Sequence, residues 1–403
     1  MYTCCFPPFG HAVGVSYRQG STGKLRGALA AVVAGVMYRS ARTAMQTRTI
    51  VPVSEPRPAV LPPKVTVVIP ARNEVAVIAN CLRSVRAQTH GEQGDSPLRV
   101  VVVDDGSSDG TGEIARAQAD EDSRVKVVRV DGPPPGWSGK VHAMYAGVEN
   151  ADPPEAGEWL LFVDADTVLA PDLIDRLIAT AEEVDADLVS TPGGPPPGRS
   201  LSWPLLMPPG LQMIGENAGP DGRGRKAFAI GHCILLRRSH YEKIGGWAAL
   251  ASRRNEDVEI ATAIRDHGGA TRTVDGLDYI TTSGMDPFSQ GWESFRKSFV
   301  AGTKGSVPAL VGIGLGQLTL SLASPTAVAV GLKSRRKGLA AFGLLGWAVQ
   351  SFAHARTAKL MRANPEYAAI APVSGALFGA LLLDGALRTI RGKTAWKGRR
   401  TKF

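Results

Sequence analysis

The stretch "WLLFVDADTVLAPD" (159–172) runs five bulky apolar residues directly into two aspartates that stand one residue apart. A continuous apolar run of this length is typical of a strand that is buried on both faces of a sheet. Two carboxylates at the rim of such a sheet repel each other and are costly to remove from water. We therefore expect a positively charged group beside Asp164 and Asp166.

Short apolar runs rich in valine alternate with helical patterns from residue 64 onward. The other runs that predict strands are "VTVVIP" (65–70), "RVVVVDD" (99–105), "VKVVRV" (125–130) and "DLVST" (187–191). The segments between them that predict helices are Glu74–Gln88, Asp109–Ala119, Gly139–Glu149 and Pro171–Val184. Repeated alternation of strand and helix predicts an α/β fold with a mostly parallel sheet.

Polar residues follow three of the predicted strands at the point where each strand ends. They are the tripeptide 72–74 after the first strand, the pair 104–105 after the second, and Asp164 with Asp166 after the fourth. Ligands of such sheets bind beyond the carboxyl ends of the strands, so these groups are expected to converge. Carboxylate oxygens favour Mg²⁺ or Mn²⁺, which take one or two protein carboxylates and complete their shell with water and phosphates. A nucleotide diphosphate is the substrate that this pattern predicts.

Three motifs resemble those of the family 2 glycosyltransferases, which have the GT-A fold. "VTVVIPARNE" (65–74), "VVVVDDGSSDGT" (100–111) and "LLFVDAD" (160–166) are similar to that family's opening strand, its nucleotide-binding turn and its metal-binding Asp-x-Asp, in the same order. The resemblance covers about Lys64–Val300 and implies a Rossmann-like, nucleotide-diphospho-sugar transferase fold. "PPPGWSGKVHAM" (133–144) and "WKGR" (396–399) resemble a membrane-bound subgroup associated with hopanoid and carotenoid glycosylation.

The resemblance implies roles for particular residues of this chain. Asp166, with Asp164 beside it, would hold a Mg²⁺ or Mn²⁺ ion that bridges the diphosphate and stabilises the charge on the leaving group. Lys140 follows a turn rich in proline and glycine and is placed to meet a phosphate as a point charge. The residues expected to bind the nucleotide sugar are Pro70, Arg72, Glu74, Asp104, Asp105, Lys140 and Asp164.

The pair Glu256-Asp257 opens a predicted helix in "SRRNEDVEIATAIRDHG" (252–268). In the family, the aspartate of this pair is the general base that removes the proton of the acceptor hydroxyl, so Asp257 and Glu256 are the expected catalytic residues. One base without an enzyme nucleophile implies a single displacement with inversion. The processive polymer synthases carry Gln-x-x-Arg-Trp after the base, whereas this chain has "QGWESFRKSF" (290–299), which predicts transfer of one sugar or a few. Trp292 either stacks on a sugar or belongs to the core.

Charge is distributed unevenly along the 403 residues. Residues 1–54 carry six Lys/Arg and no acid, residues 55–293 have a net charge of −12, and residues 294–403 have a net charge of +15. The basic region contains apolar runs, of which Val307–Leu332 is long enough to span a bilayer, while Gly338–Ala355 and Tyr367–Leu387 are weaker candidates. Buried helices of a soluble domain are the alternative. Because basic clusters flank each run, we expect a membrane with anionic lipid, and not nucleic acid, as the partner.

The predicted organisation has three parts: a basic N-terminal segment with a Pro-rich linker (1–63), a GT-A domain (64–300) and a membrane-associated helical region with a basic tail (301–403). Leu25–Tyr38 is a short apolar run that fits a marginal anchor, a signal-like segment or sequence upstream of the true start, and its lack of acid also resembles an organelle transit peptide. Residues 192–224 are rich in Pro and Gly, which predicts irregular structure, either a path for a lipid acceptor or a loop packed on the domain. His232 and Cys233 either line a site or, as the stronger expectation, form a satisfied pair in the core.

The predicted protein is a membrane-bound glycosyltransferase at the cell membrane, with its catalytic domain facing the cytoplasm and a lipid or isoprenoid as acceptor. The four cysteines show no zinc or disulfide spacing, which fits a reducing compartment. A metal-dependent nucleotidyltransferase would use a similar sheet and aspartates but would release pyrophosphate and would not need Asp257. A catalytically silent membrane protein that binds a nucleotide sugar is a further alternative. The sequence does not distinguish UDP from GDP donors.

Overall fold

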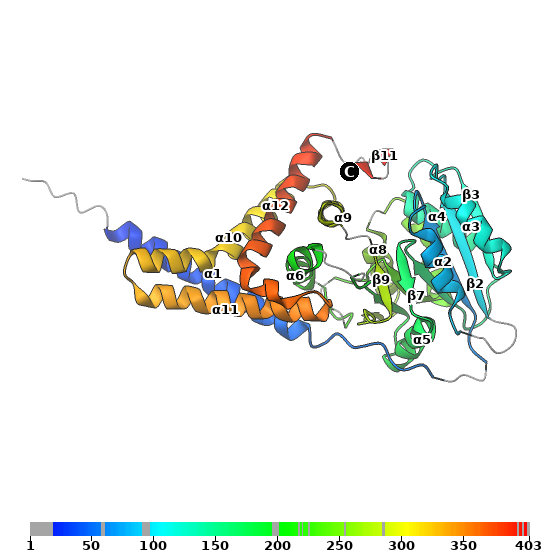
Figure 1. Cartoon of the computed structure of the whole chain (residues 1–403), viewed down its shortest axis with the longest axis horizontal. Helices are drawn as coiled ribbons and strands as arrows, with labels where there is room; N and C mark the ends of the chain where they lie inside the picture. The colour runs from blue at the N-terminus through cyan, green and yellow to red at the C-terminus, as the bar shows by residue number, and fades with distance from the viewer. Residues whose placement is uncertain are drawn as a thin grey trace, which may run out of the picture.

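The computed structural model consists of an α/β body from which a helical arm extends (Figure 1). The structure describes residues 19–57, 61–90, 97–195, 201–216, 218–219, 221–224, 226–253, 255–283, 287–392, 395–396 and 399–400. Residues 397–398 of the C-terminal motif lie outside the described residues. The same is true of Cys4 and Cys5, whereas Cys81 and Cys233 are buried free thiols.

A seven-stranded sheet forms the body, in the order β3-β2-β1-β4-β7-β6-β8. Every pair of neighbours is parallel except those made by β7, which runs antiparallel between β4 and β6. The strands are β1 Val65–Ala71, β2 Leu98–Asp105, β3 Val125–Val130, β4 Trp159–Val163, β6 Leu188–Thr191, β7 Cys233–Arg237 and β8 Thr271–Thr273. The mostly parallel α/β sheet predicted from the sequence is confirmed. A small antiparallel sheet joins β5 Thr167–Leu169 to β9 Ile280–Thr282.

Helices cover both faces of the sheet because side chains of each strand alternate between the faces. Val67 and Ile69 of β1 belong to a core shared with α2 Ile78–Arg86, α3 Thr111–Asp120 and α5 Leu173–Glu183. Val68 of the same strand packs with α4 Gly139–Glu149 and α8 Glu256–Asp266 on the other face. Shorter helices, α7 Arg238–Lys243 and η1 Trp247–Leu250, complete the second face.

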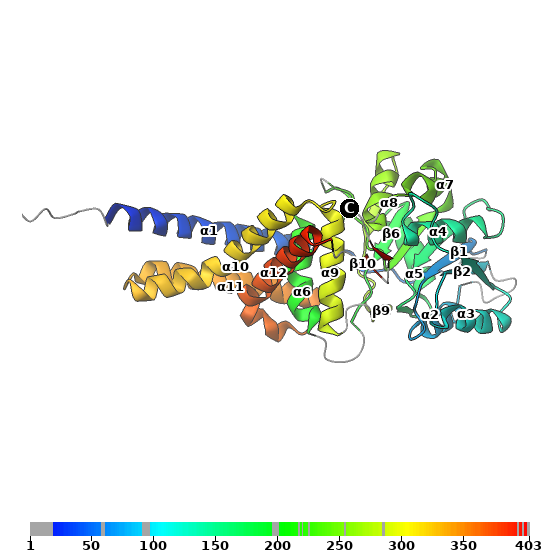
Figure 2. The same cartoon turned by 90° about the horizontal axis from the view of Figure 1, so that it is seen from above.

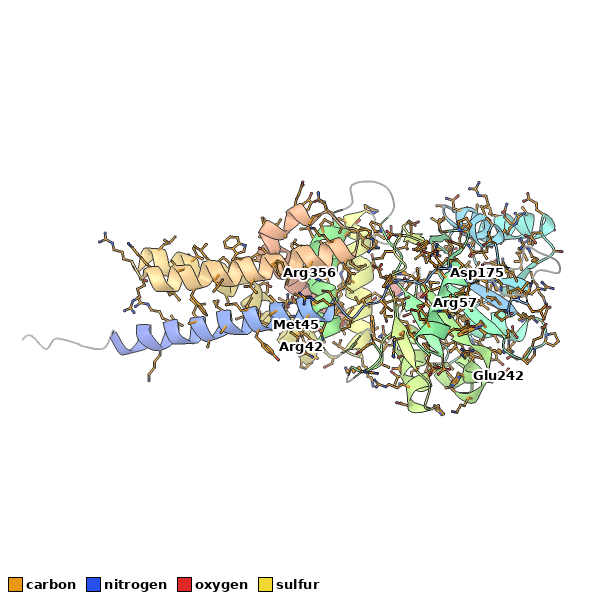
Figure 3. The ribbon with its side chains drawn as sticks, turned by 90° about the horizontal axis from the view of Figure 1, so that it is seen from below. Arg42, Met45, Arg57, Asp175, Glu242 and Arg356 are labelled. Atoms are coloured by element: carbon orange, nitrogen blue, oxygen red, sulfur yellow. The ribbon has the colours of Figure 1, made fainter. Side chains whose placement is uncertain are left out.

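The arm is built from long apolar helices of both ends of the chain (Figure 2). It contains α1 Gln19–Gln46, α10 Val307–Lys333, α11 Lys337–Leu360, η2 Pro365–Ile370 and α12 Ala371–Ile390. By length and composition alone, Val307–Lys333 and Pro365–Ile390 could cross a membrane. Arg42 and Met45 of α1 lie near Arg356 of α11 at the end of the arm beside the body (Figure 3). A two-stranded hairpin, β10 Ala395–Trp396 with β11 Arg399–Arg400, follows α12.

The prediction of irregular structure for residues 192–224 was wrong over its centre. Residues Ser202–Gly215 form α6, which contains Pro208 and Pro209 within the helix. Proline interrupts the hydrogen-bond ladder of a helix. Here α6 packs among α9 Phe288–Gly302, α11 and α12, so burial of its apolar side chains stabilises a helix that the composition disfavours.

Asp275, after β8, joins the arm to the body. Its backbone oxygen accepts a hydrogen bond from Val53 N at 3.1 Å, and its own N–H donates to Val51 O at 2.8 Å. The Asp275 carboxylate receives Arg362 Nη1, just beyond α11, at 2.9 Å. The extended segment after α1 and the end of α11 are therefore held at one point of the sheet.

Gly147 allows α4 to approach the sheet closely. A Cβ atom at this position would lie 2.4 Å from Cγ1 of Val68 and 3.2 Å from Cγ2 of Val103. Valine side chains are stiff, so we expect Gly147→Ala to destabilise the fold by about 1–3 kcal/mol through overpacking. Thermal unfolding measures the loss. Glu149→Ala, on the exposed side of the same helix, is the matched control, and equal midpoints for the two variants would contradict this packing.

Candidate active site

A cleft of about 920 Å³ opens at the carboxyl ends of β1, β2 and β4. It brings together most of the residues that the sequence predicted, although these come from five separate segments of the chain. The predicted residues that line it are Pro70, Arg72, Glu74, Asp105, Lys140, Asp164, Asp166 and Glu256. Asp104 and Asp257 do not line the cleft but contact the elements that form its walls.

The turns after β1 and β2 are tied together by hydrogen bonds. Asn73 has a positive φ of 52°, and its backbone N–H donates to Ser107 Oγ at 3.0 Å. Ser108 N donates back to Asn73 Oδ1 at 3.0 Å. Arg72 adds a hydrogen bond from Nη1 to the backbone oxygen of Asp105. Positive φ is tolerated well by asparagine, and the reciprocal bonds fix one rigid wall of the cleft.

Asp104 holds that wall from behind. Its side chain is buried and accepts hydrogen bonds from Ser107 N at 2.8 Å and from Arg129 Nη1 at 3.0 Å. With these partners Asp104 fixes the turn that carries Asp105. The structure therefore places Asp105, but not Asp104, where a ligand could touch it.

Lys140 is the positive charge expected beside the two aspartates. It lies in the first turn of α4, and its Nζ is 2.7 Å from Asp164 Oδ1 and 2.8 Å from Glu256 Oε1. The lysine therefore joins the end of β4 to the start of α8. Burial opposes the charge on Lys140, but the carboxylates of Asp164 and Glu256 outweigh burial and hold its pKa well above the usual range.

The pKa values of Asp164 and Asp166 are shifted in opposite directions. Burial alone would raise the pKa of Asp164, but Lys140 and His232 outweigh it and the pKa lies below its ordinary value. Burial and the neighbouring Asp164 carboxylate raise the pKa of Asp166. Asp166 Oδ2 accepts a hydrogen bond from Thr282 Oγ1 of β9 at 3.2 Å. Asp166 thus presents a carboxylate that a further cation would stabilise.

Asp257 lies beside the segment of chain that leads into β7. Its Oδ2 accepts from Gly231 N at 3.2 Å, and its Oδ1 accepts from Val258 N at 2.8 Å. Burial, followed by the like charge of Glu256, raises the pKa of Asp257 to about 7. A carboxylate with a pKa near neutrality is suited to accept and release a proton.

The structure adds cleft residues that the sequence reasoning missed. His232 was expected in the core with Cys233, but it lines the cleft, and its Nδ1 accepts from Gly193 N at 3.1 Å. One face of α9 also lines the cleft, through residues that include Gln290, Glu293 and Lys297. The signal available in the sequence was their helical spacing along a single face.

Trp292 lies on the other face of α9. Its ring nitrogen donates to Asp384 Oδ2 of α12 at 3.1 Å, and it packs with the apolar cluster between α9 and α12. Of the two interpretations that the sequence left open, the structure therefore favours packing over sugar stacking.

Comparison with known proteins finds a family match over part of the chain. Residues 66–245 match the family described as glycosyl transferase family 2. The chain is 27% identical over 286 residues to 4,4'-diaponeurosporenoate glycosyltransferase of Staphylococcus aureus strain bovine RF122, an alignment that covers 67% of this chain and 70% of the relative. The same enzyme of strain USA300 is 27% identical over 254 residues, covering 59% of this chain and 62% of the relative.

A solved structure has the same fold as this chain. The mannosyltransferase of Pyrobaculum calidifontis in complex with GDP-Man and Mn²⁺ aligns over 91% of this chain and 100% of its own, with a TM-score of 0.52 and 19% identity. The GT-A fold expected from the sequence is confirmed, including the apolar helices that follow the sheet.

Ionisation of Asp257 should lower the stability of the folded protein. A carboxyl whose folded pKa of about 7 exceeds its ordinary value of 3.8 makes the fold lose stability as pH rises between these values. We expect Asp257→Asn to raise the melting temperature, with a larger gain at pH 8 than at pH 5. Thermal unfolding at both pH values tests this. Asp266→Asn, at the other end of the same helix, serves as control, and a gain that is equal at both pH values would refute the burial of this charge.

Proposed function

We propose that this chain is a membrane-bound, inverting and non-processive glycosyltransferase that moves one sugar from a nucleotide-diphospho-sugar to a hydroxyl of a lipid acceptor. The observation that carries the proposal is the convergence of Asp166, Lys140 and Glu256 on one cleft that also contains the turns after β1 and β2, with Asp257 next to Glu256 behind the cleft wall formed by Gly231 and His232. Residues 64–300 would form the catalytic domain, with residues 1–63 and 301–403 supplying the membrane contacts.

A Mg²⁺ or Mn²⁺ ion fits the donor set at the end of β4. Among the described residues, no group of three or more His, Cys, Asp or Glu side chains is arranged to hold a metal ion by itself. Such ions need only one or two protein carboxylates when substrate phosphates and water complete the shell. Asp166 and Asp164 would hold the ion, and its chemistry would be to neutralise charge on the diphosphate. The mannosyltransferase of the same fold was crystallised with Mn²⁺.

The nucleoside end of the donor would bind the wall formed by the turns after β1 and β2. Pro70, Arg72, Glu74 and Asp105 line that part of the cleft. Asp105 is buried and anchored by Arg72, which suits a carboxylate that accepts hydrogen bonds from a base. The diphosphate would then reach Lys140, whose ammonium can exchange a carboxylate partner for a phosphate oxygen.

Transfer would occur in one displacement. Asp257 takes the proton of the acceptor hydroxyl while the hydroxyl oxygen forms a bond to the anomeric carbon. The bond between that carbon and the donor phosphate breaks, and its electron pair leaves with the nucleoside diphosphate, beside Lys140. One displacement inverts the anomeric configuration.

The arm supports a membrane location. Large apolar side chains are exposed on the outer faces of its helices, among them Leu315 and Leu322 of α10, Leu344 and Phe352 of α11 and Val373 of α12. Contact with lipid tails would remove this surface from water. The basic excess of residues 294–403 would meet anionic headgroups, and the buried free thiols fit a catalytic body in the reducing cytoplasm. The carotenoid glycosyltransferase of Staphylococcus aureus gives the comparison for a lipid acceptor.

Release of nucleoside diphosphate tests the reaction directly. We expect purified protein in detergent with Mn²⁺ to release nucleoside diphosphate from one member of a nucleotide-sugar panel, and a membrane lipid extract to stimulate that release. Asp166→Ala and Asp257→Asn should each lower lipid-dependent transfer by roughly 100-fold or more, because one removes a metal ligand and the other the base. Asp172→Asn, outside the cleft, is the control. Pyrophosphate released from a nucleoside triphosphate instead would identify a nucleotidyltransferase.

The pH profile tests the role of Asp257 as a base. Because a base works when deprotonated, kcat/KM should rise with pH to a plateau above about 7. Glu256→Gln removes a like charge, so the rising limb should move to lower pH even if the plateau falls. Glu259→Gln, in the same turn of α8, should leave the limb in place. A profile that is flat from pH 5 to pH 8 in the wild type would exclude this assignment.

A further inference from the structure

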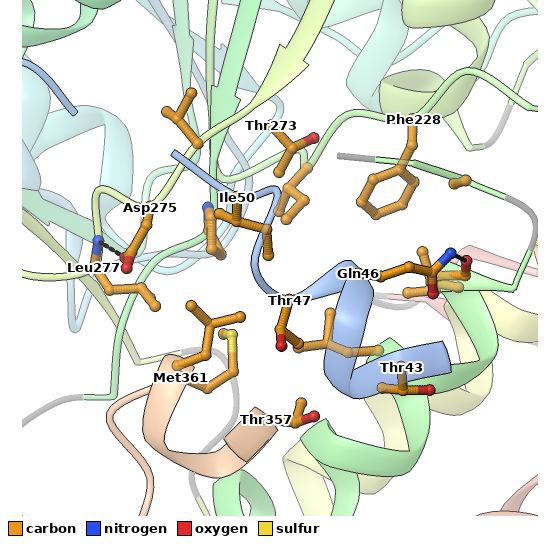
Figure 4. Close-up of a pocket in the computed structure, with 18 residues that line it drawn as sticks. Thr43, Gln46, Thr47, Ile50, Phe228, Thr273, Asp275, Leu277, Thr357 and Met361 are labelled. Atoms are coloured by element: carbon orange, nitrogen blue, oxygen red, sulfur yellow. Dashed lines mark hydrogen bonds between the residues drawn. The ribbon is translucent and has the colours of Figure 1, made fainter. Parts of the chain in front are cut away.

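A second cavity lies where the arm meets the body. It has a volume of about 90 Å³ and is lined almost entirely by apolar surface (Figure 4). Its walls come from the end of α1, from α6, from the end of α11 and from the segments that flank β6, β7 and β8. In Figure 4 the side chains of Ile50, Phe228, Leu277 and Met361 surround the common space.

The polar side chains of this cavity are already satisfied within the protein. Thr43 Oγ1 donates to Arg39 O at 3.0 Å, Thr47 Oγ1 to Ala44 O at 2.9 Å and Thr357 Oγ1 to Ala353 O at 3.0 Å. Gln46 Nε2 donates to Gly215 O at 2.7 Å, and the Asp275 carboxylate receives Arg362. Polar groups that already have partners do not select a polar ligand. The lining therefore favours hydrocarbon over a sugar or a nucleotide.

The cavity and the active site share one stretch of backbone. Ile230 lines the cavity, the N–H of the next residue, Gly231, holds Asp257, and His232 lines the donor cleft. Two residues of extended chain span no more than about 7 Å. Gly231 has no side chain and lies close to two charged groups of the site. A Cβ atom at this position would be 3.4 Å from both Asp257 Oδ2 and Lys140 Nζ.

We propose that this cavity binds the hydrocarbon chain of the acceptor, next to the end that carries the reacting hydroxyl. The inference rests on the proposed glycosyltransferase function and adds the acceptor's binding site to it. Helices α1, α6 and α11 form the arm side of the cavity, so a chain held there continues toward the apolar helices that would contact the membrane. The volume is smaller than the roughly 150 Å³ cavity that accommodates benzene, which suits a short segment of a chain and not a ring system.

Photolabelling combined with kinetics tests this site. The probes are farnesol and hexadecanol, each carrying a diazirine near its hydroxyl end, offered to the full-length protein in detergent micelles. We expect label on residues of α1, α6 or α11 that line the cavity, from the isoprenoid probe if the acceptor is branched and from the straight-chain probe if it is an acyl chain. Thr47→Trp fills the cavity, and it should lower labelling and raise the lipid KM roughly tenfold, as expected when about two methylene groups stay in water.

Matched variants separate this effect from misfolding. Arg48→Trp places the same bulk on the exposed side of the same turn and should keep wild-type labelling and KM. Ile50→Trp, which blocks the cavity from another wall, should reproduce the Thr47→Trp effect, and the donor KM should stay unchanged in all three variants. Label confined to the outer faces of α10 and α12, or unchanged labelling and lipid KM in both blocking variants, would overturn the proposal.

The outcomes also separate the cavity from the reaction. Label inside the cavity with no transfer from any nucleotide sugar would support the hydrocarbon site and reject the glycosyltransferase function. Lipid-dependent transfer with label elsewhere would support that function and reject the site.

Discussion

The ion pairs of the half-buried Lys140 ammonium are the interaction on which the candidate site depends. Asp164, at the end of β4, and Glu256, at the start of α8, would repel each other in a partly desolvated cleft. The ammonium group between them pairs with both carboxylates, so it replaces this repulsion with a link between the end of β4 and the start of α8. The same cation lowers the cost of keeping Asp166 and Asp257 nearby, since both have pKa values raised by burial.

Rigid and adaptable parts of the cleft are separated. The turns after β1 and β2 are fixed by hydrogen bonds among Asn73, Ser107 and Ser108, with Asp104 and Arg129 behind them. The charged cluster around Lys140 is held instead by ion pairs, which can exchange partners when a phosphate arrives. Under the proposed function, a nucleoside would meet a preorganised wall, while the ion pairs around Lys140 could rearrange during the reaction.

Local pattern was sufficient to predict the sheet and the convergence at its edge. The valine-rich runs are continuous because most of the strands are covered on both faces. The positions of the strands and of their ends could therefore be predicted from these runs alone. The helix α6 could not be predicted in this way, because Pro208 and Pro209 oppose a helix and only burial among α9, α11 and α12 stabilises it. His232 was misplaced for a related reason. A histidine next to a buried strand is predicted to lie in the core. The tertiary position of the segment between α6 and β7 directs its side chain into the cleft instead.

The attachment at Asp275 has a mechanical consequence. Arg362, just beyond the end of α11, forms an ion pair with the Asp275 carboxylate. Thr282, seven residues after Asp275, donates a hydrogen bond to Asp166. A change in the tilt of α11 must therefore either be absorbed within this short segment or reach the carboxylate at the cleft. The tilt of α11 is therefore a constraint on the geometry around Asp166, and the proposed placement of the arm in a bilayer would make that geometry depend on bilayer thickness.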